Sequence, residues 1–378
     1  MYIRRTIAQM ITKRFFQRRI IILYGPRRVG KTTLVKEIIS SLPNARYFNA
    51  DLINDREIWK PKSVDYLKQI VRDYKYIVID EAQNIPDTGL LLKVLVDNFP
   101  DVQFIATGSS SFDLQNTAGE PLTGRKWQFF LYPFTYNELV KGLGVFGAKN
   151  KLDTILTYGL YPEVVLQPGQ AEDILLELIN SYLLKDVFAW GNIKKPDKLI
   201  NLLKALAYQT GSTVSYNELS NLTGLNVETV ERYVDVLEKN FIIFRLMPFS
   251  RNLRGEIKKQ RKIYFWDIGI RNAIIGQFEP FDTLSPQEKG QIWENFVISE
   301  MLKLSSNYND KTQFFFWRTK DGAEIDLIAV KSKQIFAYEI KLHKSARLPR
   351  SFLKYTPAKF DVIRFDNFED FLVKPISG

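Results

Sequence analysis

The chain has 378 residues, a formal net charge of +11 at neutral pH, no cysteine and a single histidine, His343. The absence of cysteine excludes disulfides, zinc–cysteine sites and thiol catalysis, and one histidine excludes a histidine-rich metal centre or a serine–histidine hydrolase elsewhere. Any metal chemistry must therefore rest on carboxylates, which favour Mg²⁺ or Mn²⁺.

The length predicts two or three domains, and 45% hydrophobic with 25% charged residues is typical of a globular protein. No stretch approaches the roughly 20 apolar residues of a membrane span, and basic residues interrupt every apolar run near the N-terminus. We therefore expect a cytoplasmic protein with no membrane partner. The positive net charge favours a polyanionic partner, and DNA is the partner we expect; a solvated lysine-rich surface is the alternative. Part of the excess of positive charge is local, because residues 1–36 contain no acid.

The first predicted strand, residues 20–24, leads into a glycine-rich segment and then a helix. The segment reads Gly25-Pro26-Arg27-Arg28-Val29-Gly30-Lys31-Thr32 and is followed by Thr33. Gly25 and Gly30 allow backbone N–H groups to turn inward around a triphosphate, while Lys31 meets its β- and γ-phosphates and the Thr32 hydroxyl holds Mg²⁺. The helix start adds unpaired N–H groups. The segment predicts a site for ATP and Mg²⁺.

A second motif follows the apolar strand predicted at residues 76–80, where Asp80 and Glu81 stand side by side. Two carboxylates at the end of a buried strand indicate a function. We expect Asp80 in the Mg²⁺ shell and Glu81 polarising the water that attacks the γ-phosphate, which favours hydrolysis over nucleotide kinase chemistry. The alternative is an acidic helix cap.

Two further strands are predicted at residues 102–106 and 127–131, besides one at 45–50. Thr107, with Ser109 as a substitute, can sense the γ-phosphate at the end of the first, although simple turn chemistry explains such residues equally well. Arg125 precedes the second strand and could reach a phosphate of its own or of a neighbouring subunit, which includes a homo-oligomer among the expectations. A surface arginine beside a turn is the alternative.

Residues 150–195 carry apolar residues at helical spacing, interrupted by a glycine- and proline-containing corner at 158–163. We interpret them as a small lid over the nucleotide. A winged-helix pattern follows. Its expected parts are a helix at 199–209, a helix at 218–222 with a capping box of Ser215 and Glu218, a turn at Gly224, a helix capped by Asn226 and ending at Lys239, and a wing strand at 241–244.

The third of these helices is acidic, and phosphates repel acidic helices. Its acids are Glu228, Glu231, Asp235 and Glu238. The loop after the wing strand is basic and contains Arg251, Arg254, Lys258, Lys259, Arg261 and Lys262. We therefore expect contact with the DNA backbone through this wing region rather than base reading by the helix. A structural winged helix that mediates protein contact is the alternative.

The C-terminal segment offers a second chemistry. Asp326 and Glu339 fall on two predicted strands of one hairpin, where they could bind one Mg²⁺, and Glu294 lies in an amphipathic run before them. Lys341 faces the same side as Glu339 because strand side chains repeat every second residue. Such a metal ion supplies a nucleophile and a Lewis acid. Alternating charges on an exposed hairpin would look similar.

The whole chain resembles the archaeal and bacterial AAA-type ATPases with a winged helix and a C-terminal domain of the PD-(D/E)xK nuclease fold. The resemblance rests on the segments 25–32, 78–83, 107–110, 124–125 and 264–273. It implies that Glu294, Asp326, Glu339 and Lys341 fall on the nuclease motif, of which Glu339-Ile340-Lys341 is intact.

The fold class expected is α/β, a P-loop ATPase core with a parallel sheet at 1–140, a helical lid at 141–197, a winged helix at 198–262 and a nuclease-like domain at 263–378. The expected function is ATP hydrolysis coupled to action on DNA, with a C-terminal domain that binds or cleaves DNA. The alternative is a nucleotide-dependent regulatory switch that uses the winged helix and the nuclease-like domain for protein interaction.

Overall fold

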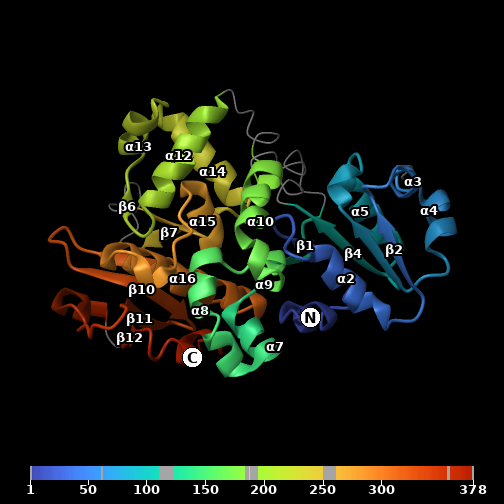
Figure 1. Ribbon diagram of the computed structural model, residues 1–378. Helices are drawn as coiled ribbons and strands as arrows, with labels where there is room; N and C mark the ends of the chain where they lie inside the picture. The colour runs from blue at the N-terminus through green and yellow to red at the C-terminus, as the bar shows by residue number, and fades with distance from the viewer. Residues whose placement is uncertain are drawn as a thin grey trace. The chain divides into compact units, whose positions relative to one another are not determined.

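The computed structural model describes residues 2–60, 63–109, 122–183, 187, 195–249, 261–355 and 358–376. The chain divides into two compact units, one of Arg5–Tyr132 and one of Met1–Arg4 with Pro133–Gly378. In Figure 1 residues 5–132 are coloured from blue to teal and residues 133–378 from green to red. No helix in these described ranges is both long enough and apolar enough to span a membrane.

The first unit is built on a five-stranded sheet in the order β2-β3-β4-β1-β5, and every neighbouring pair is parallel. Its strands are β1 (Ile20–Tyr24), β2 (Ala45–Asn49), β3 (Tyr76–Asp80), β4 (Gln103–Gly108) and β5 (Lys126–Phe130). The central strands β1, β3 and β4 are apolar and nearly all buried, as a parallel sheet covered on both faces requires. The predicted α/β core with a parallel sheet is confirmed, with strand bounds within two residues of those expected.

Helices follow the strands of this unit in alternation, and Figure 1 shows α2 and α5 beside the sheet. They are α1 (Ile7–Thr12), α2 (Lys31–Ser40), α3 (Ile53–Ile58), α4 (Val64–Val71), η1 (Ala82–Asn84) and α5 (Thr88–Asn98). Because the strands are parallel, the residues after β1, β3 and β4 meet at one edge of the sheet, where such folds bind ligands. We call this the carboxyl edge and the opposite one the amino edge.

The second unit contains a seven-stranded sheet in the order β12-β11-β10-β9-β7-β8-β6. Its strands are β6 (Thr213–Val214), β7 (Ile243–Pro248), β8 (Arg261–Phe265), β9 (Gln313–Arg318), β10 (Glu324–Lys331), β11 (Gln334–Ile340) and β12 (Ala358–Ile363). The pairs β7–β9 and β11–β12 are parallel and the others antiparallel. Since Met247 of β7 pairs with Phe315 of β9, the predicted wing and the predicted nuclease-like strands form one sheet.

The α-helices described in the second unit are α7 (Tyr136–Lys149), α8 (Leu152–Tyr158), α9 (Pro162–Leu166), α10 (Ala171–Glu177), α12 (Pro196–Tyr208), α13 (Tyr216–Thr223), α14 (Val227–Lys239), α15 (Ile268–Ile275), α16 (Pro286–Asn307) and α17 (Glu369–Leu372). Short helical turns lie at Pro168–Gln170, Leu178–Leu183, Phe281–Thr283 and Arg350–Tyr355.

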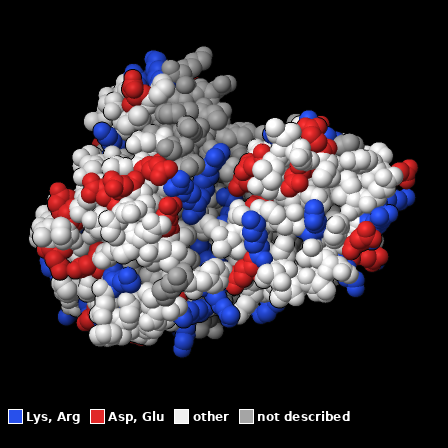
Figure 2. Space-filling model, turned by 45° about the vertical axis from the view of Figure 1, so that its right-hand side comes forward, with Lys and Arg blue, Asp and Glu red and all other residues white. Residues whose placement is uncertain are grey.

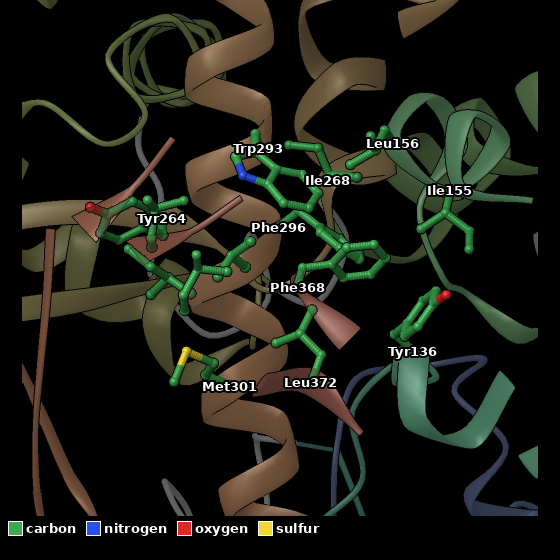
Figure 3. Packing of buried hydrophobic residues seen from close by; sticks show 14 of the residues in the cluster. Tyr136, Ile155, Leu156, Tyr264, Ile268, Trp293, Phe296, Met301, Phe368 and Leu372 are labelled. Atoms are coloured by element: carbon green, nitrogen blue, oxygen red, sulfur yellow. The ribbon is translucent and has the colours of Figure 1, made fainter. Parts of the chain in front are cut away.

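Trp293 and Phe296 of α16 lie in one hydrophobic cluster of this unit's core, where Figure 3 shows Leu156 on one side and Tyr264 on the other. Segments predicted as lid, winged helix and nuclease-like domain therefore share one hydrophobic cluster. The chain divides near residue 132, before the predicted boundary at 140, and not at 197 or 262. The division into four domains stays a prediction.

The helices predicted for a winged helix are present, with one local error. Asn226 caps α14 by accepting a hydrogen bond from the Thr229 N–H at 2.8 Å, as expected. Gly224 ends α13 in a left-handed conformation with φ 62°. The capping box of Ser215 and Glu218 is wrong, because Ser215 makes no side-chain cap and Glu218 accepts from Gln209 Nε2 at 2.9 Å.

The basic loop expected to contact DNA is only partly within the described residues. Its members Arg251, Arg254, Lys258 and Lys259 lie outside them. Arg261 and Lys262 belong to β8, and Lys262 is 2% exposed, so that these two do not extend a free basic loop. On the face shown in Figure 2, basic side chains are interspersed with acidic ones.

Candidate nucleotide site and C-terminal acid cluster

The loop between β1 and α2 takes its path from two glycines. A Cβ on Gly25 would lie 2.1 Å from the backbone oxygen of Leu131, so this close approach admits only glycine. Gly30 caps α2 with φ +93°, a conformation that other residues rarely adopt. The Nζ of the buried Lys31 donates to the backbone oxygens of Gly25 at 2.9 Å and Pro26 at 3.0 Å. The ammonium is therefore held inside the curve of the loop.

The outer turn of the loop exposes Arg27 and carries Arg28 in a left-handed conformation with φ 60°. Val29 behind it is buried, and its backbone oxygen accepts a hydrogen bond from Arg5 Nη1 at 3.2 Å. Arg5 is 6% exposed and also donates from Nη2 to the Tyr132 oxygen. This arginine anchors the loop and was not predicted, since no local pattern marks an arginine that bonds a distant backbone.

Asp80, at the end of β3, is 1% exposed and accepts three hydroxyl hydrogen bonds. The donors are Thr32 Oγ1 at 2.7 Å, Tyr47 OH at 2.5 Å and Thr107 Oγ1. The predicted glycine-rich loop and the predicted acid are therefore in direct contact through Thr32 and Asp80. Thr33, on the first turn of α2, is exposed. Tyr47 was missed by sequence reasoning. Burial and the neighbouring Asp80 raise its pKa, so its hydroxyl stays a donor at physiological pH.

Glu81 adopts a left-handed conformation with φ 51° and ψ 43°, which costs a non-glycine residue of the order of 1 kcal/mol. Its N–H donates to Thr107 Oγ1 at 3.0 Å, and its carboxylate accepts from Gln83 Nε2. Thr107 is fully buried, and its hydroxyl donates to the Asp80 carboxylate and accepts from the Glu81 N–H. It therefore positions both acidic residues. Ser109 is also buried, at 4% exposure.

These residues fit a magnesium–nucleotide group. Mg²⁺ prefers hard oxygen ligands and is held by few protein groups, and the Thr32 hydroxyl and Asp80 carboxylate present such oxygens within 2.7 Å of each other. The carboxylate that would face the ion keeps its orientation through Tyr47 and Thr107. Glu81 follows in the left-handed turn, and its carboxylate accepts a hydrogen bond from Gln83 Nε2.

Arg125 lies at the amino edge of the sheet, opposite the glycine-rich loop. In the parallel pair β1–β5, Ile20 is opposite Lys126 and Tyr24 is opposite Phe130, so Arg125 precedes β5 at the amino edge. Its Nε donates to Asp97 Oδ1 at 2.7 Å. The prediction that Arg125 reaches a phosphate of its own subunit is therefore wrong. A contact with a neighbouring subunit stays a prediction.

In the second unit the hairpin β10–β11 places Asp326 beside Glu339. Lys341 Nζ lies 3.2 Å from Asp326 Oδ2 and 2.8 Å from Glu339 Oε1, and Asp326 also accepts from the Ile340 N–H at 2.8 Å. Burial raises the pKa of Glu339, and the Asp326 charge adds to this. Burial alone would lower the pKa of Lys341, but the two carboxylates raise it. The predicted pair and lysine thus form one contact group.

Glu294 of α16 joins the same group through partners that were not predicted. Its Oε1 accepts from Tyr264 OH at 2.6 Å and from Lys262 Nζ at 3.2 Å. Lys262 also pairs with Glu324, two positions before Asp326 on β10. Burial raises the pKa of Glu294 to about 7; Lys262 opposes this and Asp326 adds to it. The burial of Lys262 was not predicted, because this lysine follows a run of basic residues that are typical of an exposed loop.

Asp326 and Glu339 offer the oxygens that a divalent cation prefers, but Lys341 already bridges them. Within the part of the chain that the structure describes, no three acidic or histidine side chains are arranged to hold a metal ion. The four residues predicted for a nuclease-like site therefore converge as an ion-paired cluster.

Residues 17–140 match the family model of the AAA domain. Residues 149–280 and 289–367 match two domains of unknown function, DUF8612 and DUF4143. An uncharacterized protein of Mycobacterium tuberculosis is 26% identical over 92% of this chain and 76% of its own length, and one of Haemophilus influenzae is 24% identical over 84% and 81%. Among solved structures, the Walker-type ATPase PABY2304 of Pyrococcus abyssi is similar with a TM-score of 0.50 and 14% identity, over 71% of this chain and 94% of that one.

The parallel sheet, the loop around Lys31 and the AAA match define the class, which is that of the P-loop ATPases. Within the first unit, the match to the AAA domain begins at residue 17 and includes all five strands of the sheet. The similarity to the Pyrococcus ATPase supports the fold alone, because the identity is low.

Proposed function

We propose that the protein hydrolyses ATP and acts on DNA. The ATPase part of this proposal rests on one observation. Asp80 accepts hydrogen bonds from both Thr32 and Thr107, so the P-loop and the acid pair form one site. Lys31 would meet the β- and γ-phosphates, and Thr32 with Asp80 would hold Mg²⁺, which supplies charge neutralisation when bound. Glu81 would orient and polarise the attacking water, and Thr107 would keep both acids in place.

Two substitutions separate binding from hydrolysis. Lys31→Ala should weaken ATP binding about tenfold or more, because an ammonium contact to the phosphates is lost, and should abolish phosphate release. Glu81→Gln should bind ATP as the wild type does but hydrolyse it about 10²-fold or more slowly. Lys60→Ala, an exposed lysine elsewhere in the unit, is the control. Undiminished turnover in Lys31→Ala would refute the proposal.

The DNA part draws its support from the second unit. Helices α12, α13 and α14 followed by the hairpin β7–β8 have the order of a winged helix, and Glu294, Asp326, Glu339 and Lys341 lie in one cluster. We propose a winged helix joined to a nuclease-like domain that binds or cleaves DNA. Incubation of labelled DNA with Mg²⁺ or Mn²⁺ tests cleavage, and Asp326→Asn with Glu339→Gln should abolish it. Equal cleavage by the wild type and by this double variant would exclude this site.

One observation favours a second function, that of a nucleotide-dependent switch whose nuclease-like domain serves protein interaction. Lys341 bridges Asp326 and Glu339, and Lys262 bridges Glu294 and Glu324, so each of the four acids already contacts a lysine of the protein. A switch predicts no cleavage, no DNA affinity at physiological salt and a change in oligomeric state on ATP addition. Arg125, supplied to a neighbouring subunit, would then couple assembly to turnover.

A further inference from the structure

The loop of residues 13–19, between α1 and β1, collects positive charge at the amino edge of the five-stranded sheet. It carries Lys13, Arg14, Arg18 and Arg19 in the acid-free N-terminal stretch. Lys13 and Arg18 are exposed, and Arg14 and Arg19 are half-buried. In the described ranges none of these four side chains makes an ion pair with a carboxylate, in contrast to Arg125, which pairs with Asp97. The loop is therefore a site of uncompensated positive potential.

Two of the arginines are pre-oriented on one ring. The guanidinium carbons of Arg14 and Arg19 lie 4.3 Å and 4.4 Å from the centroid of the Trp127 indole on β5. Stacking holds a planar guanidinium by its face and leaves its N–H edges directed outward, where they match the oxygens of a phosphate.

The backbone of the loop is held in a strained form by a buried side chain. Phe16 and Arg18 have φ 57° and 54°, which is unusual for residues other than glycine. Gln103 is 2% exposed, and its Oε1 accepts from the Phe16 N–H at 2.7 Å while its Nε2 donates to the Arg19 oxygen at 3.2 Å. Strain of this kind persists where the surroundings fix it, often at ligand-binding segments. A basic surface that only contacts solvent requires neither the strained backbone nor the buried Gln103 that holds it.

An aromatic side chain accompanies the charges. Phe16 is 46% exposed, and its ring meets Tyr76 in an edge-to-face contact with centroids 5.2 Å apart. A half-exposed ring beside arginines suits the stacking of an unpaired base, which a duplex does not offer.

We propose that residues 13–19, with Trp127, bind the phosphate backbone of a single-stranded nucleic acid, and that Phe16 stacks on one of its bases. The amino edge lies opposite the P-loop in the same sheet, so this ligand and ATP do not compete. The proposal goes beyond the ATPase and the C-terminal cluster, because it assigns a strand-binding surface to the first unit itself.

Binding of a labelled oligothymidylate to the full chain, followed by fluorescence anisotropy over a range of salt, tests the surface. Replacing Arg14, Arg18 and Arg19 together by Gln should weaken binding about tenfold or more and reduce the magnitude of the log–log salt slope by about 2, as loss of three phosphate contacts on a single strand predicts. Phe16→Leu should weaken single-strand binding about fivefold and leave duplex binding unchanged. ATP affinity should stay as in the wild type in both variants.

The matched control replaces Arg56, Lys60 and Lys68 by Gln, which removes the same charge from the same unit. An equal loss in this control would mean that only net charge matters and would overturn the proposal. So would wild-type binding by the triple arginine variant, a preference for duplex, or binding of anionic vesicles in place of the oligonucleotide. Retained ATP binding in any of these cases would leave the ATPase proposal standing.

Discussion

At the scale of single residues, the Asp80 carboxylate depends on donors from three separate segments. Thr32 belongs to the P-loop, Tyr47 to β2 and Thr107 to the end of β4. A buried carboxylate without such donors would be costly, so each hydroxyl contributes both to the fold and to the orientation of the acid.

Tyr47→Phe removes one of these donors while keeping the ring. We expect the free energy of unfolding to fall by about 1.5–3 kcal/mol, the range for a hydrogen bond to a charged group. Urea unfolding at neutral pH measures this. Tyr66→Phe, at an exposed tyrosine on α4, should change it by less than about 0.5 kcal/mol. Equal stability of Tyr47→Phe and wild type would mean that water replaces the tyrosine hydroxyl on Asp80.

At the scale of elements, the two caps predicted for helices α13 and α14 differ in the structure. Asn226 accepts from the Thr229 N–H, whereas the Ser215 side chain makes no cap and the Glu218 carboxylate accepts from Gln209 instead. Asn226→Ala should therefore lower the free energy of unfolding by about 1 kcal/mol, and Ser215→Ala by only a few tenths. Thermal unfolding of both variants would show the contrast, and equal shifts would contradict the structure.

Lys262 contacts the carboxyl groups of Glu294 and Glu324, and it thereby links strand β8 to helix α16 and strand β10. Glu294 keeps a proton up to a pKa of about 7 in the fold, against an ordinary value of 4.5. Between these values the folded chain binds more protons than the unfolded one, so its stability falls as pH rises through that window. Glu294→Gln should flatten the pH dependence of unfolding between pH 4.5 and 7.

Urea unfolding at several pH values measures this effect. Glu279→Gln, at an exposed glutamate, should keep the wild-type slope. A slope unchanged in Glu294→Gln would show that Lys262 already holds the Glu294 carboxylate ionised.

Local patterns were sufficient for the strands of the first unit, for the loop around Lys31 and for the Asp80 position, because these depend on apolar runs and glycine spacing. They were insufficient where a side chain acts on a distant part of the chain. Arg5 bonds the backbone of Val29 and Tyr132, and Lys262 is buried between Glu294 and Glu324. An arginine or lysine in a sequence reads as exposed, and only the tertiary partners show otherwise.

At the scale of the whole molecule, the second unit joins segments that the sequence separates. The hairpin β7–β8 pairs with β9, and Phe244, Leu246 and Tyr264 belong to the same hydrophobic cluster as Trp293. A segment whose strands and core are completed by another segment loses both when it is excised.

Three fragments test whether the predicted winged helix is an independent domain. Residues 133–376 should unfold in a single cooperative transition, and residues 5–132 should fold and bind ATP, because each corresponds to a compact unit. Residues 198–262 alone should give the circular dichroism of an unfolded chain, since their hairpin lacks β9 and the core around Trp293. Cooperative melting of that short fragment would mean that its three helices suffice for a core, and the boundaries at 197 and 262 would then be those of a true domain.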